Sequence, residues 1–266
     1  MEKPKNSRNQ RLVAMTAELV ANPNRFFSLS EFANKYNVAK STLSEDLSFI
    51  KEVLSSTNAS IESSIGAAGG VCYRPGISKQ KAAQILQELA AELNAPQRRL
   101  TGGFVYYSDL LFNPAVTARL GLIFAHLFSE TRPDQVLTLE TKGIPLAMFT
   151  AYYLNCPLLI ARRSNRVTEG PSVSTNYLTG SGRRIETMFL PKRSLAAGSN
   201  VLIIDDFMKA GGSALGLEHL VKEFDARVVG TGVLIATGQP VDKLVSKYSS
   251  LLTLNPDETI SVTWEE

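Results

Sequence analysis

The run Val201–Ser213, with the sequence VLIIDDFMKAGGS, combines residue types that can bind a phosphorylated sugar. Four apolar residues typical of a buried strand lead into the acids Asp205 and Asp206, and a Gly-Gly-Ser triplet then opens a helix. A helix N-terminus presents free backbone N–H groups and a partial positive charge, so a phosphate fits there. The neighbouring carboxylates can accept hydrogen bonds from vicinal hydroxyls. The run therefore predicts a site for a ribose 5-phosphate.

A second loop, Glu140-Thr141-Lys142-Gly143, has features that suit the same ligand. It follows the apolar run VLTL and precedes a predicted helix that has Pro145 near its start. The lysine supplies positive charge, and the glycine and the amides after it supply donors for an anion. Four residues are weak support by themselves. Their place, one strand–helix unit ahead of the acidic run, strengthens the interpretation.

The elements that must position these loops alternate between strand and helix from about Phe104 onward. Apolar runs typical of strands lie at 136–139, 157–161, 201–204 and 228–235, with helical patterns between several of them. Such alternation predicts an α/β domain with a mostly parallel sheet covered on both faces, in which ligands bind beyond the carboxyl ends of the strands. Between 162 and 195 two antiparallel strands joined at TGSGR predict a protruding, arginine-rich β-hairpin.

The first 75 residues predict a winged-helix DNA-binding domain. One helix face carries Leu12, Met15 and Leu19, a helix–turn–helix pattern follows, and SIESSIGAAGGVCYRP indicates a glycine-tipped hairpin. The second helix of such a pair enters the major groove of DNA. Residues whose side chains or backbone can reach phosphates and base edges are Arg8, Arg11, Lys40, Ser41, Thr42, Ser44, Gly69, Gly70 and Arg74. A helical subdomain used for dimerisation is the alternative.

Composition narrows the class of protein. The chain is 44% hydrophobic and 20% charged, with a formal net charge of +3. No apolar run approaches the roughly 18 residues that span a membrane, and the polar N-terminus does not resemble a signal peptide, so we expect a cytoplasmic protein without membrane contact. His126 and His219 lie on predicted helix faces without a nucleophile or metal constellation, so no catalytic or metal-binding residue is predicted.

The acidic run resembles the signature with which phosphoribosyltransferases bind 5-phosphoribosyl-1-pyrophosphate (PRPP). Together with AKSTLSEDLSFIK, GAAGGVCYRP, GGFVYYSDLL, ETKGIPLA and RVTEGPSVSTNY, it makes nearly the whole chain similar to the purine operon regulators of Gram-positive bacteria. The resemblance implies a winged-helix domain over 1–75 and a PRPP-binding, phosphoribosyltransferase-like effector and dimerisation domain over 76–266. It implies a homodimeric transcription regulator, a repressor or an activator, that binds double-stranded DNA at purine gene operators. PRPP would be its effector, with Mg²⁺ as an optional companion.

The resemblance also implies which residues meet PRPP: Phe104, Thr141, Lys142, Gly143, Arg162, Asp205, Asp206, Phe207, Met208, Lys209, Ala210, Gly211, Gly212 and Ser213. Family enzymes usually carry smaller residues at the positions of Phe207 and Lys209, so we expect binding without phosphoribosyl transfer. An active purine-salvage phosphoribosyltransferase with an N-terminal oligomerisation domain is the alternative. The sequence leaves open the direction of the PRPP effect, the operator sequence, the ligand affinity, the Mg²⁺ requirement and competition by other nucleotides.

Overall fold

The computed structural model describes residues 7–64, 70–179 and 184–264, and the chain divides into two compact units. The first unit comprises Met1–Ser78 with Tyr153–Asn155, and the second comprises Lys79–Tyr152 with Cys156–Glu266. Among the described residues, no helix is both long enough and apolar enough to cross a membrane. The assignment of domains to 1–75 and 76–266 stays a prediction.

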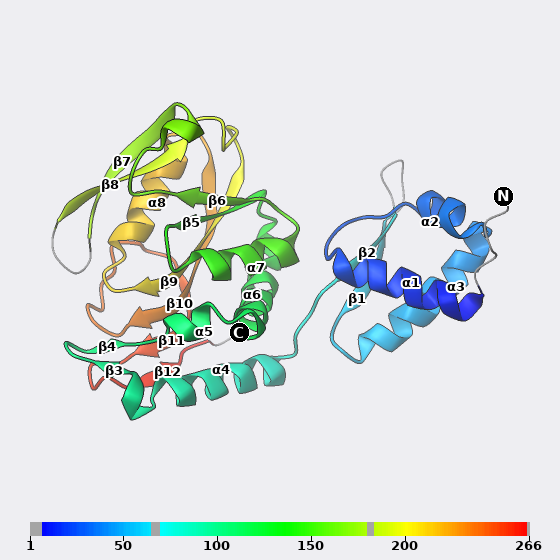
Figure 1. The fold of residues 1–266 in the computed structure, drawn as a ribbon, viewed down its shortest axis with the longest axis horizontal. Coiled ribbons are helices and arrows are strands. Elements are labelled where there is room, and N and C mark those ends of the chain that lie inside the picture. The colour runs from blue at the N-terminus through cyan, green and yellow to red at the C-terminus, as the bar shows by residue number, and fades with distance from the viewer. Residues whose placement is uncertain (1–6, 65–69, 180–183, 265–266) are drawn as a thin grey trace. The chain divides into compact units, whose positions relative to one another are not determined.

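The first unit has the element order of a winged helix, as predicted. Its elements are α1 (Arg8–Ala21), α2 (Leu29–Tyr36), α3 (Lys40–Ser55), β1 (Ser60–Ser64) and β2 (Gly70–Arg74) (Figure 1). Ser28 caps α2 in a capping box with Glu31, and Asn37 takes a left-handed conformation in the turn before α3. The strands β1 and β2 pair antiparallel, and a core that includes Met15, Leu19, Phe32, Leu43 and Val71 packs the helices on them.

A six-stranded sheet organises the second unit. Its order is β12-β11-β10-β9-β5-β6, and only β12 runs antiparallel to its neighbour. The strands are β5 (Gln135–Leu139), β6 (Leu158–Ala161), β9 (Asn200–Met208), β10 (Arg227–Thr237), β11 (Ser249–Leu254) and β12 (Ile260–Val262). The chain adds β6 on one side of β5 and β9 on the other, so the connections leave β5 and β9 in opposite directions. Ligands of open parallel sheets bind at such a switch point.

Helices and a hairpin cover the two faces of this sheet (Figure 1). The helix α8 (Gly212–Lys222) and the antiparallel strands β7 (Ser172–Leu178) and β8 (Ile185–Pro191) lie on one face, and α6 (Pro114–Leu127) and α7 (Ile144–Leu154) on the other. The remaining elements are α4 (Lys79–Leu93), which packs on β12, η1 (Pro96–Arg98), β3 (Arg99–Leu100), β4 (Phe104–Val105), α5 (Ser108–Leu111), η2 (Ser129–Thr131) and η3 (Val167–Glu169). The mostly parallel sheet and the antiparallel β7–β8 hairpin are therefore as predicted, and the hairpin packs on α8.

Strand alternation explains how both faces become buried. Val201 and Ile203 join the cluster around α8 and the hairpin, while Leu202 and Ile204 lie near the α6 aromatics Phe124 and Phe128. Successive side chains of a strand point to opposite faces, so a strand buried on both faces reads as an unbroken apolar run. One difference from the sequence prediction follows: β9 continues through Met208, so the two acids lie on a strand and not in a loop.

Candidate functional site

A cavity of about 600 Å³ opens beside the sheet's switch point. The segment between β9 and α8 forms much of its wall, and charged residues from the hairpin and from the end of β6 complete it. Its lining residues are Phe104, Arg163, Thr179, Arg184, Glu186, Asp205, Phe207, Met208, Lys209, Ala210, Gly211, Gly212, Ser213 and Ala214. The structure thus brings together most of the acidic run that the sequence pointed to, and Phe104 with it.

The turn into α8 leaves the first N–H groups of that helix without a side-chain cap. Gly211 precedes the helix at φ +85°, a conformation that favours glycine, and no side chain caps the helix there. A Cβ at this residue would also lie 3.3 Å from Val245 Cγ2. Bare donors at a helix N-terminus on a cavity wall form an anion site, with Lys209 and Ser213 beside them.

A segment after β10 holds this turn in place through hydrogen bonds to its backbone. The segment is not part of the predicted site. The ammonium of Lys243 donates hydrogen bonds to the carbonyl oxygen of Lys209 and to both the carbonyl and hydroxyl oxygens of Thr237. The backbone N–H of Leu244 donates to the carbonyl oxygen of Ala210 over 2.8 Å. Burial lowers the pKa of the Lys243 amine. No sequence pattern links residue 243 to a loop more than thirty positions earlier.

The two adjacent acids of β9 have different hydrogen-bond partners. Asp205 lines the cavity and accepts a hydrogen bond from the backbone N–H of Asp206 over 2.9 Å. Asp206 is buried and accepts the hydroxyl of Tyr107 over 2.6 Å. Only Asp205 lines the cavity, and the expectation that both carboxylates meet the ribose stays a prediction. Burial, with the neighbouring Asp206 carboxylate, raises the pKa of Asp205 well above its usual range.

Tyr107 links the two predicted phosphate loops. Its ring carries the ammonium of Lys142 at 4.8 Å from the centroid and stacks on Phe207, with 6.5 Å between ring centroids. Burial of the ring, together with Asp206, raises the pKa of the Tyr107 hydroxyl. Phe104 was the aromatic residue predicted for this region, and no motif pointed to Tyr107.

The loop Glu140–Gly143 lies beside Asp205 without lining the cavity itself. A Cβ on Gly143 would lie 2.6 Å from the hydroxyl oxygen of Thr138 and 3.1 Å from a carboxylate oxygen of Asp205, so only glycine allows this close approach. Thr141 and Lys142 are exposed. The loop follows β5, and β5 pairs with β9. This pairing brings the loop next to Asp205 on β9.

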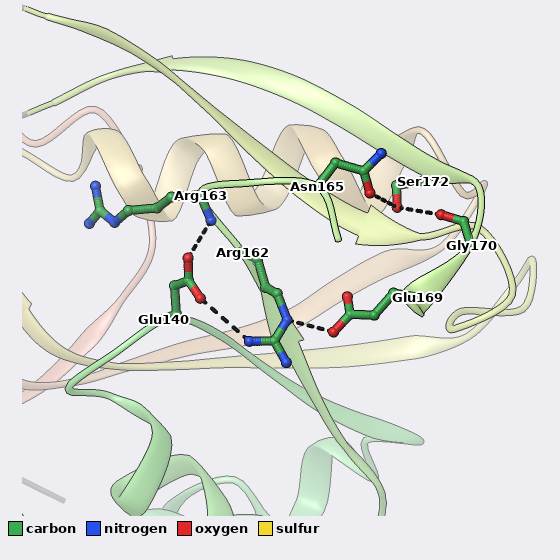
Figure 2. Close-up of polar contacts among 7 residues, drawn as sticks. All are labelled: Glu140, Arg162, Arg163, Asn165, Glu169, Gly170 and Ser172. Atoms are coloured by element: carbon green, nitrogen blue, oxygen red, sulfur yellow. Dashed lines mark hydrogen bonds and ion pairs between the residues drawn. The ribbon is translucent and has the colours of Figure 1, made fainter. Parts of the chain in front are cut away.

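Arg162 and Arg163 point in different directions and have different partners (Figure 2). Arg162 donates to Glu169 over 2.6 Å and pairs with Glu140 at 3.5 Å, away from the cavity lining. Arg163 reaches the cavity and forms a close ion pair with Glu186, while its backbone N–H donates to Glu140 over 2.7 Å. Arg163, which the sequence did not single out, therefore lies on the cavity lining, and Arg162 as a ligand contact stays a prediction.

A groove of about 590 Å³ on the first unit lies where α3 meets β1 and β2. Two lysines and a ring of serines line it, together with Leu29, Leu47, Ile61, Gly70 and Val71: Lys40, Lys51, Ser28, Ser30, Ser44, Ser48, Ser63 and Ser64. Lysines and hydroxyls are the side chains that most often contact DNA phosphates. Of the predicted DNA contacts, Lys40, Ser44 and Gly70 lie here, Ser41 and Thr42 start the same helix, and Gly69 lies outside the described residues.

Three predicted DNA contacts have partners inside the first unit. Arg11 is 5% exposed and donates to Asp46 over 2.6 Å, so its prediction as a surface phosphate contact is corrected. Arg8 donates to the same carboxylate over 3.1 Å, but its side chain is 60% exposed and can still reach a phosphate. Arg74 pairs with Glu62 across the β1–β2 hairpin. An apolar helix face does not reveal in advance that an arginine on it will be buried.

Comparison with protein families matches each unit to one description. The model "Bacterial purine repressor, N-terminal" matches residues 7–75, and the model "Phosphoribosyl transferase domain" matches residues 107–266. The purine biosynthesis transcriptional repressor PurR of Bacillus subtilis (strain 168) is 47% identical over 249 residues, which cover 93% of this chain and 87% of that protein. The chain belongs to the PurR family of purine biosynthesis transcriptional regulators.

Other members of the PurR family are also similar to this chain over nearly its whole length. The purine biosynthesis transcriptional activator PurR of Lactococcus lactis (strain IL1403) is 41% identical, over 93% of this chain and 92% of that protein. Among solved structures, adenine phosphoribosyltransferase of Saccharomyces cerevisiae aligns with a TM-score of 0.53 and 24% identity, over 63% of this chain and 98% of that one. The second likeness shows the fold alone: this part of the chain has a phosphoribosyltransferase fold.

Proposed function

We propose that this chain regulates purine biosynthesis genes by binding their operator DNA through the groove at α3 and PRPP in the cavity at the switch point. The observation that carries the proposal is the uncapped N-terminus of α8 with Lys209 and Asp205 on one cavity wall. Backbone donors and the lysine suit the 5-phosphate, and the carboxylate suits a ribose hydroxyl. A regulator of this kind acts in the cytoplasm and, because operators are commonly two-fold symmetric, as a homodimer.

Charges around the cavity support a ligand with a second anionic group. Arg163, Arg184 and Lys209 line it, and Lys142 lies over the ring of Tyr107 on the neighbouring loop. PRPP carries a phosphate at one end of its ribose and a pyrophosphate at the other. A single phosphate site would leave the negative charge of the pyrophosphate without a cationic partner. Mg²⁺ is proposed as a companion of the pyrophosphate, and calorimetry of PRPP binding with and without Mg²⁺ tests it.

Binding without phosphoribosyl transfer is part of the proposal. The aromatic side chains of Phe104 and Phe207 line the cavity, and the fixed charge of Lys209 favours retention of an anion over departure of one. The test incubates the chain with PRPP, Mg²⁺ and each purine base. We expect no nucleotide and no released pyrophosphate, and turnover at enzymatic rates would establish the purine-salvage alternative.

The regulatory function is tested by titrating purine promoter DNA with the chain, with and without PRPP. We expect PRPP to change the affinity at least several-fold in one direction, because an effector must bind the two states unequally. Lys40→Ala should weaken DNA binding, lower its dependence on salt and leave PRPP binding unchanged. The control Lys35→Ala removes a lysine of α2 that pairs with Glu18 and does not line the groove. Equal affinity with and without PRPP would exclude PRPP as the effector.

A further inference from the structure

One of the cationic side chains that could bind a ligand in the cavity is already paired with a carboxylate of the chain itself. Arg163 and Glu186 both line the cavity, and their side chains form a close ion pair with each other. Glu186 belongs to β8, on the hairpin, and Arg163 follows the end of β6. The pair therefore joins the hairpin to the end of the sheet across the cavity wall.

A buried tyrosine fixes this ion pair. Tyr177 is the cross-strand partner of Glu186, donates its hydroxyl to the same carboxylate oxygen over 2.7 Å, and accepts from Arg163 over 3.0 Å. Its side chain is 5% exposed and packs against Gly216 of α8. The Glu186 carboxylate is thus held by the hydroxyl of a buried tyrosine, which is not free to move with a ligand.

The backbone of Arg163 is fixed as well, from the opposite direction. Its N–H donates to Glu140, the first residue of the loop Glu140–Gly143, and Figure 2 shows the guanidinium pointing away from that contact. Only the side chain of Arg163 is therefore free to change partner. Arg184 and Lys209, the other cations on the lining, form no ion pair with any residue that the structure describes.

We propose that Glu186 competes with the ligand for Arg163. A ligand must displace the Glu186 carboxylate from the guanidinium and offer phosphate oxygens in its place. The inference rests on the proposed function and adds a determinant of ligand specificity to it. A guanidinium binds carboxylate and phosphate with the same planar fork of donors, so one replaces the other directly. A pyrophosphate group carries more negative charge than a carboxylate. Glu186 therefore favours ligands with such a group over sugars with a single phosphate.

The experiment measures binding of PRPP and of inorganic pyrophosphate to the full chain by calorimetry. We expect Glu186→Gln to tighten both by about fivefold, the equivalent of about 1 kcal/mol for a partly exposed ion pair. The amide oxygen still accepts from Tyr177, so the fold should be unchanged, which circular dichroism checks. Glu169→Gln makes the same charge change next to Arg162, outside the cavity lining, and should alter binding less than twofold.

A double variant tests whether Glu186 acts through Arg163. Arg163→Gln should weaken binding of PRPP and pyrophosphate, and adding Glu186→Gln to it should bring no further gain. A gain of the same size in both backgrounds would show general charge repulsion and overturn the inference. So would a Glu186→Gln variant that binds as the unaltered chain or more weakly. A chain that binds neither PRPP nor pyrophosphate would overturn the proposed function as well, whereas normal binding limits the failure to the inference.

Discussion

Asp46 of the first unit is buried and Asp205 of the second is half-buried, and the two carboxylates have opposite surroundings. Asp46 of the first unit has a 1% exposed side chain and accepts hydrogen bonds from the guanidinium groups of both Arg8 and Arg11. Asp205 of the second unit accepts one backbone N–H and forms no ion pair with any residue that the structure describes. One carboxylate is neutralised by its own chain, and the other is kept where a ligand can reach it.

The difference separates a residue that maintains the fold from one that waits for a ligand. A buried charge is costly unless it is paired, so Asp46 has to be matched by arginines for α1 and α3 to pack. Asp205 bears that cost as a raised pKa. Strongly shifted groups in a cleft are candidates for function, whereas paired ones usually are not. The comparison therefore predicts which substitution damages stability and which damages ligand binding.

Removing Asp46 should have the largest effect. Asp46→Ala leaves the guanidinium of Arg11 buried without its partner, which typically costs about 3–5 kcal/mol. We expect the first unit to unfold at a much lower urea concentration and DNA binding to be lost, while PRPP binding in the second unit persists. Glu45→Ala, on the exposed side of the same helix, is the matched control and should change stability little. Equal stability of the two variants would contradict the role given to Asp46.

Substitution at Asp205 and at its neighbour should separate the two acids. Asp205→Asn keeps an acceptor but removes its charge, so PRPP binding should weaken by about five- to tenfold, since hydrogen bonds to charged groups contribute about 1–1.5 kcal/mol more than neutral ones. Asp206→Asn keeps an acceptor for the Tyr107 hydroxyl and should bind PRPP with nearly unchanged affinity. Calorimetry on both variants measures the difference. A larger loss at Asp206 than at Asp205 would mean that the orientation along β9 changes when the ligand binds.

The sequence predicted the elements better than it predicted the orientation of side chains. The strand–helix alternation, the hairpin and the helix–turn–helix each have a local periodicity, and they lie close to their expected ranges. Arg11 is buried, and neither Arg162 nor Asp206 lines the cavity, which the motifs alone did not indicate. A motif places a residue on an element, but the face it points to depends on the register of that element with its neighbours.

Contacts between distant segments were out of reach for a different reason. Lys243 binds the carbonyl oxygen of Lys209, and Tyr107 lies between Lys142 and Asp206, over sequence separations that no periodicity spans. These residues support the predicted loops without belonging to any motif. Motifs carry the groups that touch a ligand, whereas the groups that hold those loops in place are set by tertiary packing.

The pH dependence of stability gives the finest test of the comparison. The folded-state pKa of Asp205 is raised above its ordinary value of 3.8 by burial, with Asp206 adding to the shift and Arg163 opposing it. Between that value and the raised pKa the folded chain binds more protons than the unfolded chain, so the free energy of unfolding falls as pH rises. The slope is at most about 1.4 kcal/mol per pH unit for one proton.

Urea unfolding of the unaltered chain and of Asp205→Asn across this window measures that slope, because the amide cannot titrate. We expect the variant to gain relative stability as pH rises, and the gap between the two to close as pH falls toward 4. Saturating PRPP should make the slope shallower, since a hydroxyl that donates to the carboxylate favours its ionised form. If the free energies of unfolding of the two chains changed with pH in parallel, folding would not alter the pKa of Asp205. The contrast drawn between Asp205 and Asp46 would then be wrong.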